Sequence, residues 1–340
     1  MTAAYARLRV WGALPERYSR LQVAASTVDA EGRIVALLVA PGVVCNGRRP
    51  PRKPYAATAL VVDGAEVTEV VLPELDLHGP KIDVLGNGFV LAGARCRVPP
   101  ALTGVTGAAI RAQIPRNALV VDAGGAIVRA FHVGDGIEQL MTGRDGDLWI
   151  SYFDQASLYA PLPDRPAWAF RRKGARKRRA GPLRRGSDIL PGLIRWTADG
   201  DVARWPKRDR GDTVDWIDCY ALNVGRDRTW AYPYPDFPLV EIDRAGLLRV
   251  LSAPVRGASG ILVAGDRVAF VTGQGHGAPD AGRYGVTYAR TGDGIEAVST
   301  VPLVLPSGLR PETWASGIVA RDDRMWVRFG NDRTWYVLTL

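Results

Sequence analysis

Short apolar runs alternate with tight polar turns along the whole chain of 340 residues. In GIEQLMTGRDGDLWISYF, residues 136–153, two such runs flank an Asp-Gly turn. Asp-Gly, Asn-Gly and Gly-Asp pairs supply the positive φ angles that tight hairpins need, and short apolar runs between such turns are typical of antiparallel strands. The pattern predicts an all-β chain built from hairpins.

The hairpin recurs, and a regular recurrence predicts a repeat architecture. Six copies lie at residues 22–39, 81–92, 136–153, 218–232, 258–271 and 315–329. A second hairpin with Asp at its turn follows five of them, at residues 58–72, 117–131, 192–205, 238–251 and 285–299. The last unit, residues 334–340, stops after one strand.

The missing strand has a candidate at the other end of the chain. Residues 5–11, YARLRVW, alternate apolar and polar side chains, as expected of an outer strand. We therefore expect one domain over residues 1–340, a six-bladed β-propeller of four-stranded antiparallel blades whose closing blade is completed by the N-terminal strand. A β-sandwich, or two small β domains, is the alternative.

Aligning the turns places three tryptophans, Trp149, Trp230 and Trp326, at one repeat position, which indicates core packing. The segments RDGDLW and RDDRMW, at residues 144–149 and 321–326, resemble turns of the lyase and sugar-lactonase propellers. That resemblance implies the fold alone and transfers no catalytic residue.

The net charge of +9 comes from one segment. Residues 171–185, RRKGARKRRAGPLRR, hold nine of the 44 Lys and Arg residues, and the other 35 equal the 35 acidic residues. We expect residues 164–190 to be a basic insertion within blade three. It could bind anions, nucleic acid included, or be a solvated loop. The candidate anion-binding residues are Arg171, Arg172, Lys173, Arg176, Lys177, Arg178 and Arg179.

Three cysteines and three histidines form no metal or disulfide pattern. The sequence has no secretory or membrane-spanning apolar run, so we expect a cytoplasmic protein that does not associate with membranes. We also expect a monomer. No cofactor is identified, although several carboxylates at one rim could hold a divalent cation.

We expect the site on the rim that carries the long connections, because long loops carry function more often than short turns. His276 and Glu138 are the candidate general bases, and His276 could equally be a solvated loop residue. The candidate ligand-binding residues on this rim are Asp135, Tyr152, Asp154, Asp218, Tyr232, Tyr234, Asp236, Glu312 and Trp314. Asp135 and Asp218 could instead cap turns, and the aromatic rings could simply pack on the core.

The sequence contains no GxSxG elbow, P-loop or dinucleotide fingerprint. We therefore expect a binding module that presents one rim to a protein or an anionic small molecule. The alternative is an enzyme, a metal-assisted lyase or hydrolase with its site at the mouth of the channel.

Overall fold

The computed structural model describes residues 5–47, 49–96, 115–153, 192–204, 214, 216–243, 245–273 and 284–340. Within these ranges the chain is built from β-strands, with a single short 3₁₀ turn at Glu16–Tyr18. No helix in them is long and apolar enough to cross a membrane. The expectation of an all-β protein is confirmed.

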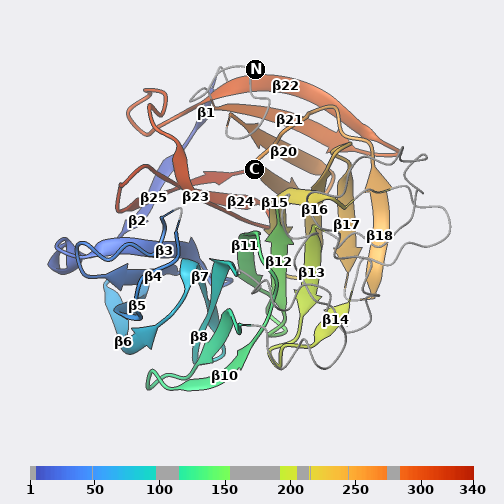
Figure 1. The fold of residues 1–340 in the computed structure, drawn as a ribbon. Coiled ribbons are helices and arrows are strands. Elements are labelled where there is room, and N and C mark those ends of the chain that lie inside the picture. The colour runs from blue at the N-terminus through green and yellow to red at the C-terminus, as the bar shows by residue number, and fades with distance from the viewer. Residues whose placement is uncertain are drawn as a thin grey trace, which may run out of the picture.

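Strands that follow one another in the sequence pair antiparallel in groups of four (Figure 1). Group 1 is β3 (Gln22–Val28), β4 (Ile34–Val39), β5 (Tyr55–Asp63) and β6 (Glu66–Leu75). Group 2 is β7 (His78–Leu85), β8 (Gly88–Arg95), β9 (Ala118–Val121) and β10 (Ile127–Phe131). Group 3 is β11 (Ile137–Thr142), β12 (Leu148–Tyr152), β13 (Leu193–Trp196) and β14 (Val202–Arg204).

The C-terminal half repeats this order. Group 4 is β15 (Asp218–Val224), β16 (Thr229–Tyr234), β17 (Leu239–Asp243) and β18 (Gly246–Leu251). Group 5 is β19 (Gly260–Ala264), β20 (Arg267–Thr272), β21 (Gly285–Thr291) and β22 (Ile295–Val304). Group 6 is β23 (Ala315–Arg321), β24 (Arg324–Phe329) and β25 (Thr334–Thr339), with β2 (Arg9–Ala13) beside β25. A single parallel bridge, Asn223 to Ala320, joins groups 4 and 6 into one sheet.

The N-terminal segment differs from its prediction in one respect. The expected single strand over residues 5–11 is divided in two: β1 (Ala6–Arg7) pairs parallel with β22 of group 5, and β2 pairs antiparallel with β25. Leu8, between them, is fully buried and donates its backbone N–H to Val304 O, 2.9 Å away. The chain thus crosses from one sheet to the next at Leu8, and only its second part is the partner of the last strand.

The local chemistry that predicted the hairpins is present at their turns. Asp122 Oδ1 accepts the backbone N–H groups of Gly124 and Ala126, each at 2.9 Å. Asp243 Oδ1 likewise accepts those of Ala245 and Gly246. These bonds satisfy turn donors that the strand ladder leaves over.

The core lies between the groups. The aligned tryptophans Trp149, Trp230 and Trp326 are each less than one-tenth exposed, which confirms their assignment to core packing. Trp326 also stacks edge-on against Trp11 of β2, with 5.6 Å between ring centroids. The cysteines Cys45, Cys96 and Cys219 are buried and unbridged.

The first strands of the groups lie innermost and contact one another in sequence order. β3 contacts β7, β7 contacts β11, β11 contacts β15, β15 contacts β19, and β19 contacts β23. β23 then contacts β3, so the succession returns to its start. Because these strands all run in the same sense along the repeat, their first residues meet at one end and their last residues at the other.

Candidate functional site

A cavity of about 1430 Å³ lies among the innermost strands. Residues from β3, β7, β11, β15 and β23 line it, together with the segment leading into β19. Exposed side chains such as Ser316 and Tyr234 line one end, where the first strands begin, and we call this end the mouth. The cavity therefore lies at the rim on which the sequence placed the candidate site.

β-Bulges turn extra residues into this cavity. On β11, Ile137 faces Tyr152 and Gln139 faces Ser151, so that Glu138 is the extra residue. The same irregularity recurs near the start of β3, β15 and β23, and the extra residues there are Ala24, Tyr220 and Ser316. All four extra residues line the cavity. Bulges bend a strand and re-aim its side chains, and here they do so at equivalent positions.

Glu138 and Asp218 form the acidic part of the lining, on groups 3 and 4. Glu138 is partly exposed to the cavity, whereas Asp218 is almost fully buried. The Tyr220 hydroxyl donates to Asp218 Oδ2 at 3.1 Å. Beside them, Gln139 Nε2 donates to the carbonyl oxygen of Tyr220 at 3.3 Å. The structure thus brings together two carboxylates that the sequence singled out.

A basic part of the lining comes from group 6. Arg328, on β24, is 7% exposed, and its Nη1 donates to Asp332 O at 3.0 Å. Arg333 Nη1 donates to the carbonyl oxygen of Leu21 at 3.2 Å. Arg328 Nε and Arg333 Nε and Nη2 are buried with no hydrogen-bond partner in the described part of the chain. Burial lowers the pKa of Arg328, as does Arg333, whereas Asp332 raises it.

Lys81 and Arg95 add two more cations to the lining from group 2. Burial lowers the pKa of Lys81, and the nearby carboxylate of Glu138 acts in the opposite direction. Arg95 lies over the ring of Phe153, with its Cζ 4.5 Å from the ring centroid. The described lining therefore holds four cations and two carboxylates, whereas the sequence predicted a mouth rich in carboxylates.

Three predicted rim residues lie in the core and do not line the cavity. Asp135 is 6% exposed, and its Oδ1 accepts the backbone N–H of Cys96 at 2.8 Å. Tyr152 is fully buried and donates its hydroxyl to Val133 O at 2.6 Å. Tyr232 is also fully buried, and its hydroxyl bonds the carbonyl oxygen of Val255. The two tyrosine rings are thus packed in the core, whereas the Asp135 bond reaches a backbone N–H 39 residues away in the sequence and is not a turn cap.

Four further predicted residues have exposed side chains. Tyr234 lines the cavity and packs edge-on against Phe237, with 5.6 Å between ring centroids. Asp236, Glu312 and Trp314 are exposed at the same rim but are not part of the cavity lining.

The remaining candidates lie outside the described residues. They are His276, Asp154, Arg171, Arg172, Lys173, Arg176, Lys177, Arg178 and Arg179. The basic insertion as a whole falls between β12 and β13, which pair directly with each other.

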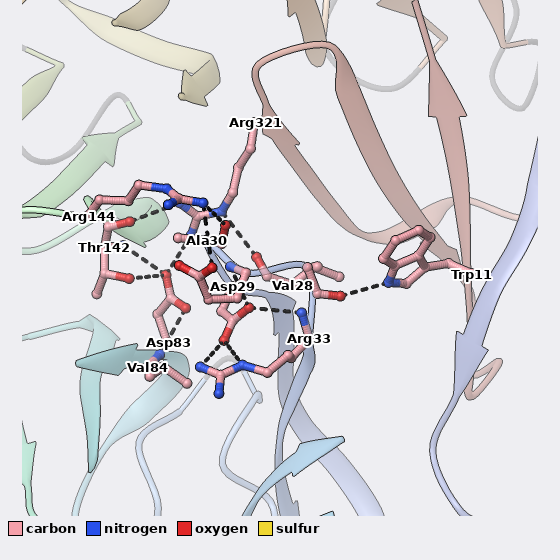
Figure 2. A network of polar contacts seen from close by, with 12 residues as sticks. Trp11, Val28, Asp29, Ala30, Arg33, Asp83, Val84, Thr142, Arg144 and Arg321 are labelled. Atoms are coloured by element: carbon pink, nitrogen blue, oxygen red, sulfur yellow. Dashed lines mark hydrogen bonds and ion pairs between the residues drawn. The ribbon is translucent and has the colours of Figure 1, made fainter. Parts of the chain in front are cut away.

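A network of charged and polar groups, which we call the floor network, lies beyond the lining residues at the end of the cavity away from the mouth (Figure 2). Arg321 Nη2 lies 2.9 Å from Asp83 Oδ2, Arg321 Nη1 donates to Thr142 O at 2.8 Å, and Nε donates to Val28 O at 3.3 Å. Asp83 Oδ2 also accepts the backbone N–H and the hydroxyl of Thr142. The network directly follows the lining residues of β3, β7 and β11, and it joins groups 1, 2, 3 and 6.

The floor network corrects one expectation. The sequence places His78, Lys81 and Asp83 together at the beginning of the second unit, and this position predicts that Asp83 lies at the mouth. Asp83 instead lies near the end of β7, fully buried against Arg321. Asp83 shares a face of β7 with Lys81 but lies two residues further from the mouth, beyond the lining residues of that strand.

Within the described residues, no three His, Cys, Asp or Glu side chains gather closely enough to hold a metal ion. Glu138 and Asp218 are the only acidic residues in the described lining.

No protein-family model matches the sequence, and no curated protein matches it. Similar solved structures are β-propeller proteins. A virginiamycin B lyase of Staphylococcus aureus is 12% identical with a TM-score of 0.44, over 98% of this chain and 99% of that one. A gluconolactonase of Xanthomonas campestris is 13% identical with a TM-score of 0.40, over 98% and 99%. The Swd1 propeller domain of Myceliophteria thermophila is 8% identical with a TM-score of 0.41, over 98% and 99%. Likenesses this distant bear on neither activity nor partner.

Proposed function

We propose that this chain is a six-bladed β-propeller binding module whose mouth binds a small polar molecule. The six strand groups are its blades, and β2 completes the last one. Support for the closed ring comes from the innermost strands, whose succession of contacts ends with β23 against β3. The β2–β25 pairing supports closure by the N-terminal strand.

The cavity is the observation that carries the proposal. Its volume of about 1430 Å³ exceeds the ~300–1,000 Å³ of ordinary ligand sites. Charged side chains on opposite walls, such as Arg328 and Glu138, can orient a polar ligand, while Ile318 and Val319 add apolar surface. The four bulges, at equivalent positions in four strands, direct side chains into this space.

The test is native mass spectrometry of the full chain purified at neutral pH. We expect a bound small molecule whose mass disappears on denaturation. The Ser316→Trp variant places an indole at the mouth and should lose that mass. Val298→Trp, on an exposed position of outer strand β22, is the matched control and should retain it. A bound mass that is retained in Ser316→Trp would contradict the proposal. So would the absence of any bound molecule when the chain is mixed with a panel of metabolites and measured in the same way.

A second candidate is an enzyme, a lyase or hydrolase that works at the same mouth. Lys81 favours an enzyme, because burial lowers the pKa of this cavity-lining amine, and a lowered pKa makes the neutral, proton-accepting form more accessible than in an exposed lysine. Glu138 lies close enough to Lys81 to raise the pKa of its amine, and it would be the partner carboxylate.

For the metal-assisted form of this candidate, chelation by EDTA should lower the melting temperature of the chain, and added Mg²⁺ or Ca²⁺ should restore it. A melting curve that EDTA does not change counts against it.

The basic insertion carries a separate prediction, which is that it binds nucleic acid. If residues 171–185 hold nucleic acid, their deletion should abolish the salt-dependent retention of the chain on DNA or heparin columns. Unchanged retention would remove nucleic acid as a partner of this segment.

A further inference from the structure

Two arginines on one wall of the cavity lack the partners that other arginines of this protein have. Arg321, in the floor network, uses Nε, Nη1 and Nη2 in hydrogen bonds. Arg195 reaches both Asp145 and Asp147, at 2.8 and 2.5 Å. Arg328 and Arg333, in contrast, leave three buried nitrogens without a partner in the described part of the chain. Buried donors without acceptors are rare in folded proteins, so these three need an explanation.

The nearest carboxylate does not supply it. Asp332 Oδ1 accepts the backbone N–H of Thr334 at 2.9 Å, and Oδ2 accepts the Tyr336 hydroxyl at 3.1 Å. Among the described residues, neither Arg328 nor Arg333 forms an ion pair. Arg333 also lies near enough to Arg328 to disfavour its charge. Two like charges with little access to solvent are therefore held side by side, and an anion between them would relieve both their repulsion and their missing bonds.

We propose that Arg328 and Arg333 bind an oxyanion, a carboxylate or a phosphate, carried by the small molecule that fills the cavity. This inference rests on the proposed function. The planar guanidinium group matches the geometry of both oxyanions, and two such groups on one wall can bind one anion from two directions.

The carboxylates of the lining orient the ligand. Arg328 and Arg333 belong to group 6. Glu138 belongs to group 3, which is three steps away in the order of contacts, whereas Asp218 belongs to group 4, whose β15 contacts β23 directly. These carboxylates repel an anion and accept hydrogen bonds from hydroxyl or ammonium groups. The ligand class is therefore a polar molecule with an oxyanion at one end and hydrogen-bond donors at the other.

The test compares melting temperatures of the full chain with 20 mM inorganic phosphate, 20 mM succinate or chloride at the same ionic strength. Binding in the millimolar range should raise the wild-type melting temperature by about 2–4 °C over chloride. A response to phosphate alone or to succinate alone identifies which oxyanion the pair prefers. No response to either would overturn the inference.

Variants locate the effect. Arg333→Gln should lose the response, and so should Arg328→Gln if it folds; each is measured against its own melting temperature in chloride. Arg290→Gln removes an exposed arginine of β21 and is the matched control for lost charge. A full response in Arg333→Gln would overturn the inference and show binding elsewhere. If both anions fail but native spectra still show a mass that Ser316→Trp loses, the inference fails and the proposed function stands.

Discussion

The two ends of the cavity use the same residue types in opposite ways. At the floor, Arg321 and Asp83 are 6% exposed or less, and each is fully engaged. At the mouth, Arg328 and Arg333 keep donors without acceptors in the described residues. Burial raises the pKa of Asp83, and Arg321 and Thr142 oppose that shift. The floor network therefore stabilises the packing of the strand groups against one another, whereas the mouth keeps the buried donors that we propose bind a ligand.

The largest effect is expected from breaking the floor network. Arg321→Met leaves Asp83 buried without its counter-charge and should lower the free energy of unfolding by about 3–5 kcal/mol. Urea unfolding at pH 7 measures this. The double variant Arg321→Met/Asp83→Leu should recover part of the loss, since no lone charge remains. A loss in the double variant equal to the sum of the two single losses would mean that the pair does not interact.

A pair of amide side chains gives the next comparison. Asn223, near the floor end of β15, bonds the carbonyl oxygens of Ile261 and Asp322 and the backbone N–H of Asp322. Asn223→Ala should lower the free energy of unfolding by about 2–3 kcal/mol, because three buried backbone groups lose their partners. Gln139, near the mouth, has one 3.3 Å bond and a buried Oε1 without a partner in the described chain. Gln139→Ala should lower the free energy of unfolding by about 0.5 kcal/mol or less. Equal losses in urea unfolding would remove the contrast between the two ends.

Replacing an arginine by methionine at the mouth, unlike the same replacement at the floor, should have little effect on the free energy of unfolding. Arg333→Met removes one hydrogen bond to Leu21 O but also one of two neighbouring positive charges. We expect the free energy of unfolding to stay within about 1 kcal/mol of wild type, measured without added phosphate or carboxylate. A loss as large as that of Arg321→Met would make Arg333 a structural residue.

The smallest expected effect is a change in the chemical reactivity of one side chain, the amine of Lys81. Because burial lowers the pKa of Lys81, its amine should be acetylated by dilute acetic anhydride at lower pH than the exposed Lys53, which is an internal reference. Peptide mapping across pH 6–10 measures both midpoints. Glu138→Gln should move the Lys81 midpoint lower still, since the carboxylate favours the charged amine. Coincident profiles for Lys81 and Lys53 would contradict this prediction.

The sequence predicted the strands well because hairpins are local. Turn residues such as Asp122 and Asp243, with apolar runs on either side, specify both strands of a hairpin within about fifteen residues. The N-terminal segment was harder, because the division at Leu8 depends on Val304, which is distant in the sequence. Of the predicted site residues, Glu138, Asp218 and Tyr234 line the cavity, since their positions in the repeat place them at the mouth.

The sequence by itself thus determined the hairpins, their repetition and the rim at which the cavity opens. Only the tertiary structure decided which polar residues face one another. Arg321 and Asp83 are 238 residues apart, and Arg333 and Leu21 are 312 apart. Neither contact has a local signal, because the packing of distant strand groups against one another is what brings these side chains together. Bulges at Glu138 and Tyr220 add a further choice, because one extra residue re-aims a side chain without altering the apolar pattern around it.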